Sequence, residues 1–422
     1  MRFVSGPPSI IEEVSAGTIP ILLYGRSSSP AAASAGAAIA QAVRRQKLSP
    51  AAAAWDLLSV ALSVVTADTI VKRAKSPDGW TRQLELQVAV SDPEIWNSRR
   101  TTLESMLGFL TTDVWMVTFV RGTHHPQLPR AIERPAADSV ALLSGGLDSL
   151  IGALDLHADG EKLFAVSHTV RGDRKKQDRF ARAVRTAAHL QVNHNANMPR
   201  HAKETSQRSR SLIFLALAVL AATATQRYAD GDVIPVYICE NGFIAINVPL
   251  TGARLGSLST RTAHPHFLGE FQHLVNELGL RIELRNPYAE RTKGEMLSQC
   301  RDQDTLGDLA SDSTSCGRFL RYNYMHCGRC IPCQIRRAAF LASKQIDTTP
   351  YFFEDLGHLQ GVELDDVRSV AMARLVVEDQ GLDRWIGSSL TSPHIHNGEA
   401  LRSMIQRGLD ELGALHARFD IS

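Results

Sequence analysis

The sequence predicts an α/β fold in which a doubly wound parallel sheet is joined to an extra N-terminal α+β domain. Two observations predict the sheet: apolar strand patterns alternate with helical segments after residue 138, and a glycine-rich turn follows the first of these strands. The third observation is the length of 422 residues, which exceeds what one such sheet needs and indicates a second domain. The predicted strands of the sheet are 140–143, 163–167, 233–239 and 281–284, and the predicted helices lie near 149–157, 176–190, 209–229 and 266–278.

A stretch with three prolines and no apolar periodicity separates the two predicted domains. Upstream of it, strand patterns stand beside helical spacing, which predicts a small α+β domain. That domain carries no catalytic pattern, so we expect it to dock a partner. The predicted strands there are 19–24, 83–90 and 114–120, and the helices are 50–71 and 93–110. The predicted division of the chain is 1–120 for the N-terminal domain, 121–138 for the linker, 139–345 for the sheet domain and 346–422 for a helical C-terminal extension.

The glycine-rich turn after the first strand of the sheet domain is the main chemical signal in the chain. A buried strand that breaks at two glycines and restarts as a helix leaves backbone N–H groups free to bind phosphate. Ser144 and Ser149 add hydroxyl donors, and Asp148 could orient the turn or hold Mg²⁺. The chain has no GxxxxGK[ST] pattern at this place, which argues against a P-loop kinase or GTPase. The residues of the turn are Ser144, Gly145, Gly146, Leu147, Asp148 and Ser149.

Four of the six cysteines lie in one short segment. Thiolates at such spacing can close a tetrahedral Zn²⁺ site, and four sulfur ligands leave no position open for water, so the metal would be structural. An iron–sulfur cluster is the main alternative. We expect the two remaining thiols, Cys239 and Cys300, to be buried and inert. The predicted ligands are Cys316, Cys327, Cys330 and Cys333.

The order of three motifs resembles one family of ATP-using enzymes. The SGGxDS turn, then Thr292-Lys293-Gly294-Glu295, then the cysteine segment that runs on to Phe340 are similar to the QueC-like family, the 7-cyano-7-deazaguanine synthases of the PP-loop ATPases. The resemblance covers residues 138 to 345 and implies an adenine nucleotide α-hydrolase-like fold that cleaves ATP between the α and β phosphates. It also implies that 7-carboxy-7-deazaguanine is adenylated, and that Ser144, Asp148 and Lys293 are catalytic, with Arg210 and Lys293 as phosphate contacts.

One segment departs from the family pattern. Between Cys239 and Phe267 the family's short substrate segment is missing, and a polar, glycine-punctuated stretch stands in its place. Such a stretch at the carboxyl end of a parallel strand is where α/β sheets place ligands. Glu240 and Asn241 could bind a purine-like edge, and Arg254 and Arg261 could face a carboxylate or phosphate, or merely cap the surface. The histidines His264 and His266 are expected to shape the start of the next helix rather than to bind metal, because no third ligand has obvious spacing.

The size of the chain and its N-terminal addition resemble the QueC-like members of bacterial antiphage systems, the QatC type and the CBASS-associated proteins. That resemblance implies a partner protein whose amino end receives the deazaguanine. Two alternatives stay open at this point: a housekeeping 7-cyano-7-deazaguanine synthase that uses ammonia, and a catalytically inactive nucleotide-sensing subunit of a defence complex.

Composition restricts the remaining functions. The formal net charge is +2, from 46 basic and 44 acidic residues, so the composition lacks the excess of basic residues that is typical of nucleic-acid binding. The apolar stretch 211–224 is too short to cross a bilayer, so we expect no membrane role and a cytoplasmic location.

Overall fold

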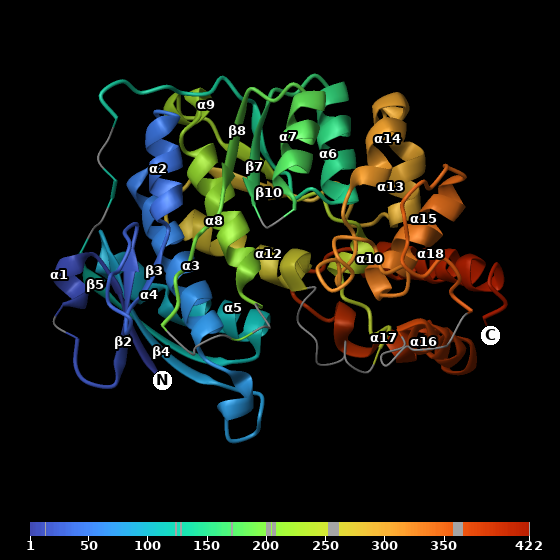
Figure 1. Ribbon diagram of the computed structural model, residues 1–422, viewed down its shortest axis with the longest axis horizontal. Coiled ribbons are helices and arrows are strands. Elements are labelled where there is room, and N and C mark those ends of the chain that lie inside the picture. The colour runs from blue at the N-terminus through green and yellow to red at the C-terminus, as the bar shows by residue number, and fades with distance from the viewer. Residues whose placement is uncertain are drawn as a thin grey trace.

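The computed structural model describes residues 1–12, 14–122, 125–126, 129–169, 172–199, 204, 208–251, 261–357 and 366–421. Two five-stranded sheets lie side by side, and a group of helices from the C-terminal third covers the end of the second sheet (Figure 1).

The N-terminal sheet has the strand order β3-β2-β1-β4-β5, and every pair in it is parallel. The domain is therefore α/β, and the α+β assignment from the sequence was wrong, because β1 mixes polar with apolar residues and β3 is too short to be recognised as a strand. The strands are β1 (Arg2–Gly6), β2 (Thr18–Leu23), β3 (Ala33–Ala35), β4 (Gln83–Val90) and β5 (Val114–Arg121). The helices are α1 (Pro8–Ile11), α2 (Ala37–Arg45), α3 (Ala52–Ile70), α4 (Pro93–Ser98) and α5 (Arg100–Thr111), with a 3₁₀ turn η1 (Arg73–Lys75).

The second sheet has the order β10-β9-β6-β7-β8 and is also parallel throughout. It confirms the predicted α/β fold and the four predicted strands, and it adds β8, which the sequence had assigned to a helix over 176–190. Its strands are β6 (Ser139–Leu142), β7 (Leu163–His168), β8 (Ala188–Val192), β9 (Ile234–Tyr237) and β10 (Ile282–Arg285). Its helices are α6 (Leu147–Ala158), α7 (Arg174–Ala183), α8 (Arg210–Ala222), α9 (Gln226–Ala229), α10 (Gly242–Ala245) and α12 (Pro265–Glu277), with a 3₁₀ turn η2 (Arg261–Ala263).

When each sheet is numbered along the chain, both have the strand order 3-2-1-4-5. Equivalent helices also meet across the boundary: α3 and α8, which precede the fourth strands, pack together, and so do α5 and α12, which precede the fifth. The α3–α8 contact is reciprocal. Asp68 near the end of α3 accepts the backbone N–H of Ser209 before α8, and Thr223 at the end of α8 accepts the N–H of Ala51 before α3. This is the pattern of a two-fold interface, here formed within one chain.

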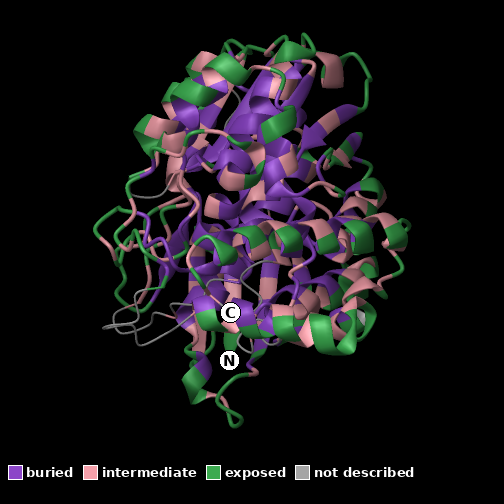
Figure 2. Cartoon of the chain, turned by 90° about the vertical axis from the view of Figure 1, so that its right-hand side faces the viewer, coloured by how far each residue is buried: buried purple, intermediate pink, exposed green. Residues whose placement is uncertain are grey.

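A continuous apolar core joins the two sheets and explains why they form one body. Buried residues from α3, α8 and strands of both sheets belong to the same cluster (Figure 2). Helix α3 is long and apolar enough to span a membrane by composition, but 94% of that window is buried inside the protein. Its place between β4 and α8 makes it a core helix.

The C-terminal third covers the carboxyl end of the second sheet and has its own apolar core with α10 and α15. Helix α18 packs along α15, and its Arg407 pairs with Glu295 of α13 at 2.6 Å. The elements of this region are α13 (Lys293–Gln299), α14 (Gln303–Leu309), η3 (Ala310–Asp312), α15 (Ile331–Ser343), α16 (Asp366–Gln380), α17 (Leu382–Ile386), η4 (Gly387–Leu390) and α18 (Gly398–Ala417).

Candidate functional site

The predicted phosphate turn joins β6 to α6. Gly145 has a φ of +89°, a conformation that favours glycine, and Gly146 is the residue before the first turn of α6, which begins at Leu147. The Ser144 hydroxyl lies 3.1 Å from that of Ser149 and accepts the Gly146 N–H at 3.2 Å. Two hydroxyls and the unpaired N–H groups of a helix start therefore meet at one point, which is a suitable site for an anion.

Asp148 lies inside this turn and connects three elements. Its carboxylate forms an ion pair with the Lys293 ammonium group and accepts the side-chain and backbone N–H groups of Asn241 at 2.6 and 3.2 Å. Lys293 is the first residue of α13, which a reciprocal Thr292–Glu295 capping box holds in place. The carboxyl ends of β6 and β9 and the start of α13 are thus brought together, as expected where the strand order of a sheet reverses.

Glu240 lies beside this cluster, in a 220 Å³ pocket that Ser144, Asp148 and Lys293 also line. Burial and the charge of Asp148 raise the pKa of the Glu240 carboxyl to about 8, which favours the neutral form of this side chain near neutral pH. A protonated carboxyl can donate a hydrogen bond as well as accept one.

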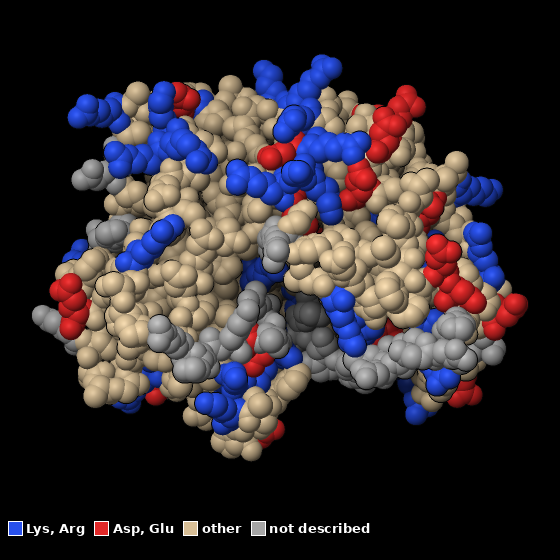
Figure 3. All heavy atoms as spheres, viewed as in Figure 1, with Lys and Arg blue, Asp and Glu red and all other residues tan. Residues whose placement is uncertain are grey.

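Arg210, the first residue of α8, lines a larger cavity of about 1250 Å³ that opens from the phosphate turn. Its guanidinium group stacks 5.5 Å from the centre of the Phe214 ring, and its buried Nε has no hydrogen-bond partner among the described residues. Burial lowers its pKa, while Asp173 acts in the opposite direction. Arg210 shares this cavity with Ser144 and Gly146, so its partly buried cation is suited to a phosphate bound there. On the outer face of the molecule, Lys and Arg side chains gather over α7, above a hollow (Figure 3).

The N-terminal domain holds the start of α8 in place. The Asp68 carboxylate accepts the backbone N–H groups of Arg208 and Ser209 at 3.1 and 3.0 Å and the Ser209 hydroxyl at 2.7 Å. Asp68 is itself fully buried and paired with Arg82, which also binds Asp113 at 2.5 Å. The position of Arg210 thus depends on a buried ionic network in a different domain.

Sequence reasoning missed two groups that line the site. Thr314 donates its N–H to the Gly145 carbonyl at 3.0 Å and binds the Lys176 ammonium group through its hydroxyl, so the segment before the cysteines lies over the turn. His168 ends β7, lines the large cavity and lies 2.7 Å from His194. Burial and the neighbouring His194 lower the His168 pKa to about 2. In the sequence, the only signal for His168 was its position at the end of a predicted strand.

Of the two predicted arginines, the structure describes only one. Arg254 lies outside the described residues. Arg261 lines a separate pocket and donates to the Phe109 carbonyl at 2.7 Å. His264 caps α12 by accepting the His266 N–H at 3.2 Å, which confirms its predicted role at that helix start.

The four predicted cysteines form one buried cluster, in which their sulfur atoms all lie within 4.8 Å of one another. The Cys316–Cys330 and Cys327–Cys333 sulfur distances are both 3.9 Å. A tetrahedral zinc ion with Zn–S bonds of about 2.3 Å needs sulfur separations of about 3.8 Å. The donor set therefore fits a structural zinc ion. Cys239 and Cys300 are buried apart from this cluster, as predicted.

Comparison with known proteins gives one informative similarity. No model of a known protein family matches the chain, and no solved structure matches it. The chain is 28% identical over 240 residues to the 7-cyano-7-deazaguanine synthase of Novosphingobium aromaticivorans, and the match covers 51% of this chain and 97% of that protein. Together with the parallel sheet and the cysteine cluster, this distant similarity supports a relationship between the chain and the QueC-like synthases.

Proposed function

We propose that this protein is an ATP-dependent, AMP-forming synthase that adenylates the carboxylate of a 7-deazaguanine and passes the acyl group to an amine. The observation that carries the proposal is the phosphate turn. Two hydroxyls meet a helix start there, and Ser144 and Gly146 of the turn line one cavity with the cation of Arg210. The similarity to a 7-cyano-7-deazaguanine synthase supports the choice of substrate class.

The first step joins the substrate to AMP. A carboxylate oxygen forms a bond to the α phosphorus of ATP while the bond to the β-phosphate oxygen breaks, and pyrophosphate leaves with the electron pair. The six residues Ser144 to Ser149, with Arg210 and Lys293, hold the phosphates and stabilise the charge that develops on the leaving pyrophosphate. Mg²⁺, when bound, would neutralise part of that charge, and the Asp148 carboxylate, which lies in the turn, would hold it.

The second step releases AMP. The amine nitrogen attacks the acyl carbon, the bond to the AMP oxygen breaks, and the nitrogen loses a proton to water or to AMP. Glu240 lines the pocket at the turn, at the carboxyl end of β9. Asn241 does not fit its predicted contact with substrate, because it is fully buried and its amide group donates to Asp148 and accepts the Ile244 N–H; it positions Asp148 instead. With its raised pKa, a neutral Glu240 can hydrogen-bond a purine-like edge without repelling the substrate carboxylate.

For the amine we propose the amino end of a partner protein in bacterial antiphage defence. About half of this chain lies outside the match to the synthase, and the cavity beside the turn is larger than most small-molecule sites. Ammonia is the alternative amine and agrees with the name of the similar enzyme. A nucleotide-sensing role without catalysis is the third possibility, and the intact set of phosphate donors argues against it. The N-terminal domain, for which we propose docking of the partner, also packs its helix α3 against α8.

The test is incubation of the purified protein with ATP, Mg²⁺ and 7-carboxy-7-deazaguanine, with ammonia or a candidate partner protein, followed by mass spectrometry of AMP and products. Substrate-dependent AMP with a nitrile supports the ammonia-using synthase. AMP together with a partner whose mass has increased supports protein conjugation. ATP binding without AMP under every condition contradicts the enzymatic proposal.

A further inference from the structure

Three side chains with metal-binding groups meet at a place remote from the cysteine cluster. His266 and Glu270 lie one turn apart on α12, and His394 comes from the segment between η4 and α18. One ligand atom from each lies within 4.8 Å of the other two. The sequence alone did not reveal this set, because His394 is more than one hundred residues away from α12 in the chain.

The contacts of these side chains orient them for a shared ligand. His394 Nε2 lies 2.7 Å from a Glu270 carboxylate oxygen, and His266 Nδ1 lies 3.1 Å from the Ser392 hydroxyl. A metal-binding histidine is usually held through its second ring nitrogen by a polar group outside the coordination sphere. Ser392 provides that contact for His266 and leaves its Nε2 available for an ion.

Gly269 shows that the close approach of His394 is built into the fold. A Cβ atom at residue 269 would lie 2.4 Å from the His394 ring carbon Cγ, which no side chain can tolerate. Only glycine at this position lets His394 lie against α12, between the turns that carry His266 and Glu270.

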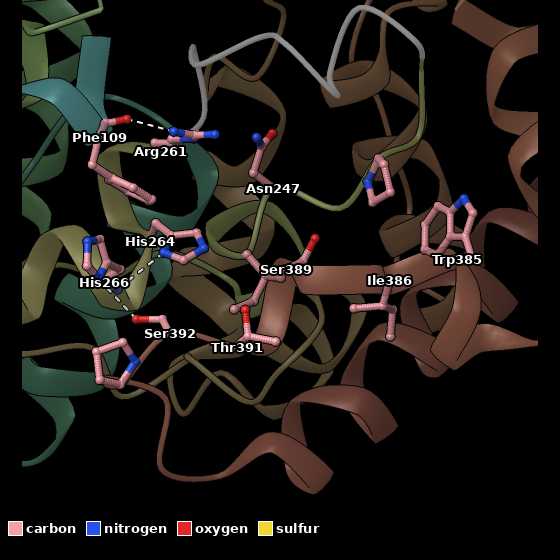
Figure 4. A pocket seen from close by; sticks show the side chains of 14 residues that line it. Phe109, Asn247, Arg261, His264, His266, Trp385, Ile386, Ser389, Thr391 and Ser392 are labelled. Atoms are coloured by element: carbon pink, nitrogen blue, oxygen red, sulfur yellow. Dashed lines mark hydrogen bonds between the residues drawn. The ribbon is translucent and has the colours of Figure 1, made fainter. Parts of the chain in front are cut away.

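Of the three side chains, His266 lines a pocket of about 520 Å³ between the N-terminal domain, α12 and the C-terminal extension (Figure 4). His266 and Ser392 lie on one side of it, and Arg261 lies near Phe109. Two imidazoles and a carboxylate supply three ligands to a zinc-like ion and leave a coordination position open. The nearby Arg261 cation favours an anion at that position.

We propose that His266, Glu270 and His394 bind a second divalent transition-metal ion, of the zinc, cobalt or nickel type, in addition to any ion in the cysteine cluster. Imidazole and carboxylate ligands suit these metals. The ion connects α12 to the C-terminal extension and offers its open position to an anionic ligand, such as a carboxylate or phosphate, in the pocket. The site does not depend on the function proposed above.

The test is metal stoichiometry of the full-length protein after equilibrium dialysis against micromolar Zn²⁺. We expect two zinc ions per wild-type chain, and one per chain for His394→Ala, Glu270→Gln and Gly269→Ala. His273→Ala is the matched control, because His273 lies on the same helix, is largely exposed and pairs with Glu277 at 3.3 Å, away from the proposed ligands. This control variant is expected to keep both ions, and circular dichroism checks that every variant is folded.

Replacement with Co²⁺ separates the two sites by their spectra. Four thiolates give an intense sulfur-to-cobalt charge-transfer band, whereas a site of nitrogen and oxygen ligands gives only weak d–d bands. We expect the weak bands to vanish in His394→Ala while the charge-transfer band remains. One metal ion per wild-type chain, or two ions in all three variants, would overturn the proposal.

Discussion

The two five-stranded sheets share a strand order and differ in the segment after the first strand. Strand β1 runs into Pro7 and Pro8 and the four-residue helix α1, whereas β6 runs into Gly145 and the 12-residue helix α6. Proline removes an N–H donor, but a glycine turn before a helix presents several. Among the described residues, the predicted phosphate turn therefore occurs in one copy of the topology alone, which indicates that the turn, rather than the strand order, would carry the chemistry.

The N-terminal copy contributes support instead of chemistry. Its α3 buries one face of α8, and Asp68 holds the backbone at the start of that helix. On the opposite side of the site, Glu411 of α18 binds the Thr292 hydroxyl that caps α13. Arg210 and Lys293, the two predicted phosphate contacts, are thus each positioned by a part of the chain outside the PP-loop domain. The following predictions test this division, from the largest expected effect to the smallest.

Loss of the zinc ligands should have the largest effect, because the cysteine cluster has no counterpart in the N-terminal copy. Structural zinc contributes on the order of 10 kcal/mol, which is comparable to the whole stability of a domain. We expect Cys333→Ser to abolish zinc binding in the cluster and soluble expression. Removal of zinc from the wild-type protein with a strong chelator should unfold it, and added Zn²⁺ should restore it. A chelated protein that keeps its melting temperature would contradict this prediction.

Ser144→Ala should remove activity and leave the fold intact, whereas Lys293→Met also leaves the buried Asp148 carboxylate unpaired and lowers stability. We expect Ser144→Ala and Lys293→Met each to lower the rate of AMP formation by about 10²-fold or more, because each removes a donor to the leaving pyrophosphate. Ser9→Ala provides the matched control, since Ser9 is exposed in α1, the helix that follows the first strand of the N-terminal copy. A variant of Ser144 with the rate of the control would show that the turn does not bind the phosphates.

Asp68→Asn tests whether the N-terminal domain positions Arg210. The change removes a buried charge opposite Arg82, so we expect a loss of unfolding free energy of about 3 kcal/mol. We also expect the KM for ATP to rise about tenfold, equivalent to about 1.4 kcal/mol, with little change in kcat. Asp78→Ala is the control, because Asp78 is exposed in the same domain and makes only local turn contacts. If Asp68→Asn and Asp78→Ala have equal KM values for ATP, Asp68 contributes to stability and does not position Arg210.

The smallest effect should be a pH dependence that comes from Glu240. Its pKa in the folded protein, about 8, is above that of an ordinary glutamate, so its contribution to stability is complete at low pH and is lost as the pH rises through 8. Ionisation adds a negative charge beside Asp148 and the substrate carboxylate, so the adenylation rate should fall over the same range. We expect Glu240→Gln to keep activity and to remove this pH dependence of stability and rate. The melting temperature and the rate of AMP formation, measured below and above pH 8, check the prediction.

The phosphate turn, the cysteine ligands and four strands of the second sheet were predictable because each leaves a local pattern. Two adjacent glycines after an apolar strand, or cysteines two residues apart, need no knowledge of distant contacts. The sequence showed Asp148 and Lys293 in two separate motifs. Only the resemblance to a family, and no local rule, placed both motifs in one site, so their ion pair was not predictable.

Other features depend on contacts between distant segments, which no local pattern encodes. Asp68 has the surroundings of an ordinary helix residue in the sequence, and only the packing of α3 on α8 places it under Ser209. Strands β3 and β8 were missed because Ala33–Ala35 is too short, and Ala188–Val192 follows helix formers without a turn signal. His394 meets α12 only through the fold of the C-terminal extension.

The most direct test of the central claim follows one oxygen atom. The purified protein would be given ATP, Mg²⁺ and 7-carboxy-7-deazaguanine labelled with heavy oxygen in its carboxylate, together with the amine that supports turnover. If the carboxylate attacks the α phosphorus, one labelled oxygen must appear in AMP when the amine displaces it. The predicted result is AMP that carries the label, formed about 10²-fold more slowly by Ser144→Ala. AMP without the label, or ADP in place of AMP, would contradict adenylation at this site.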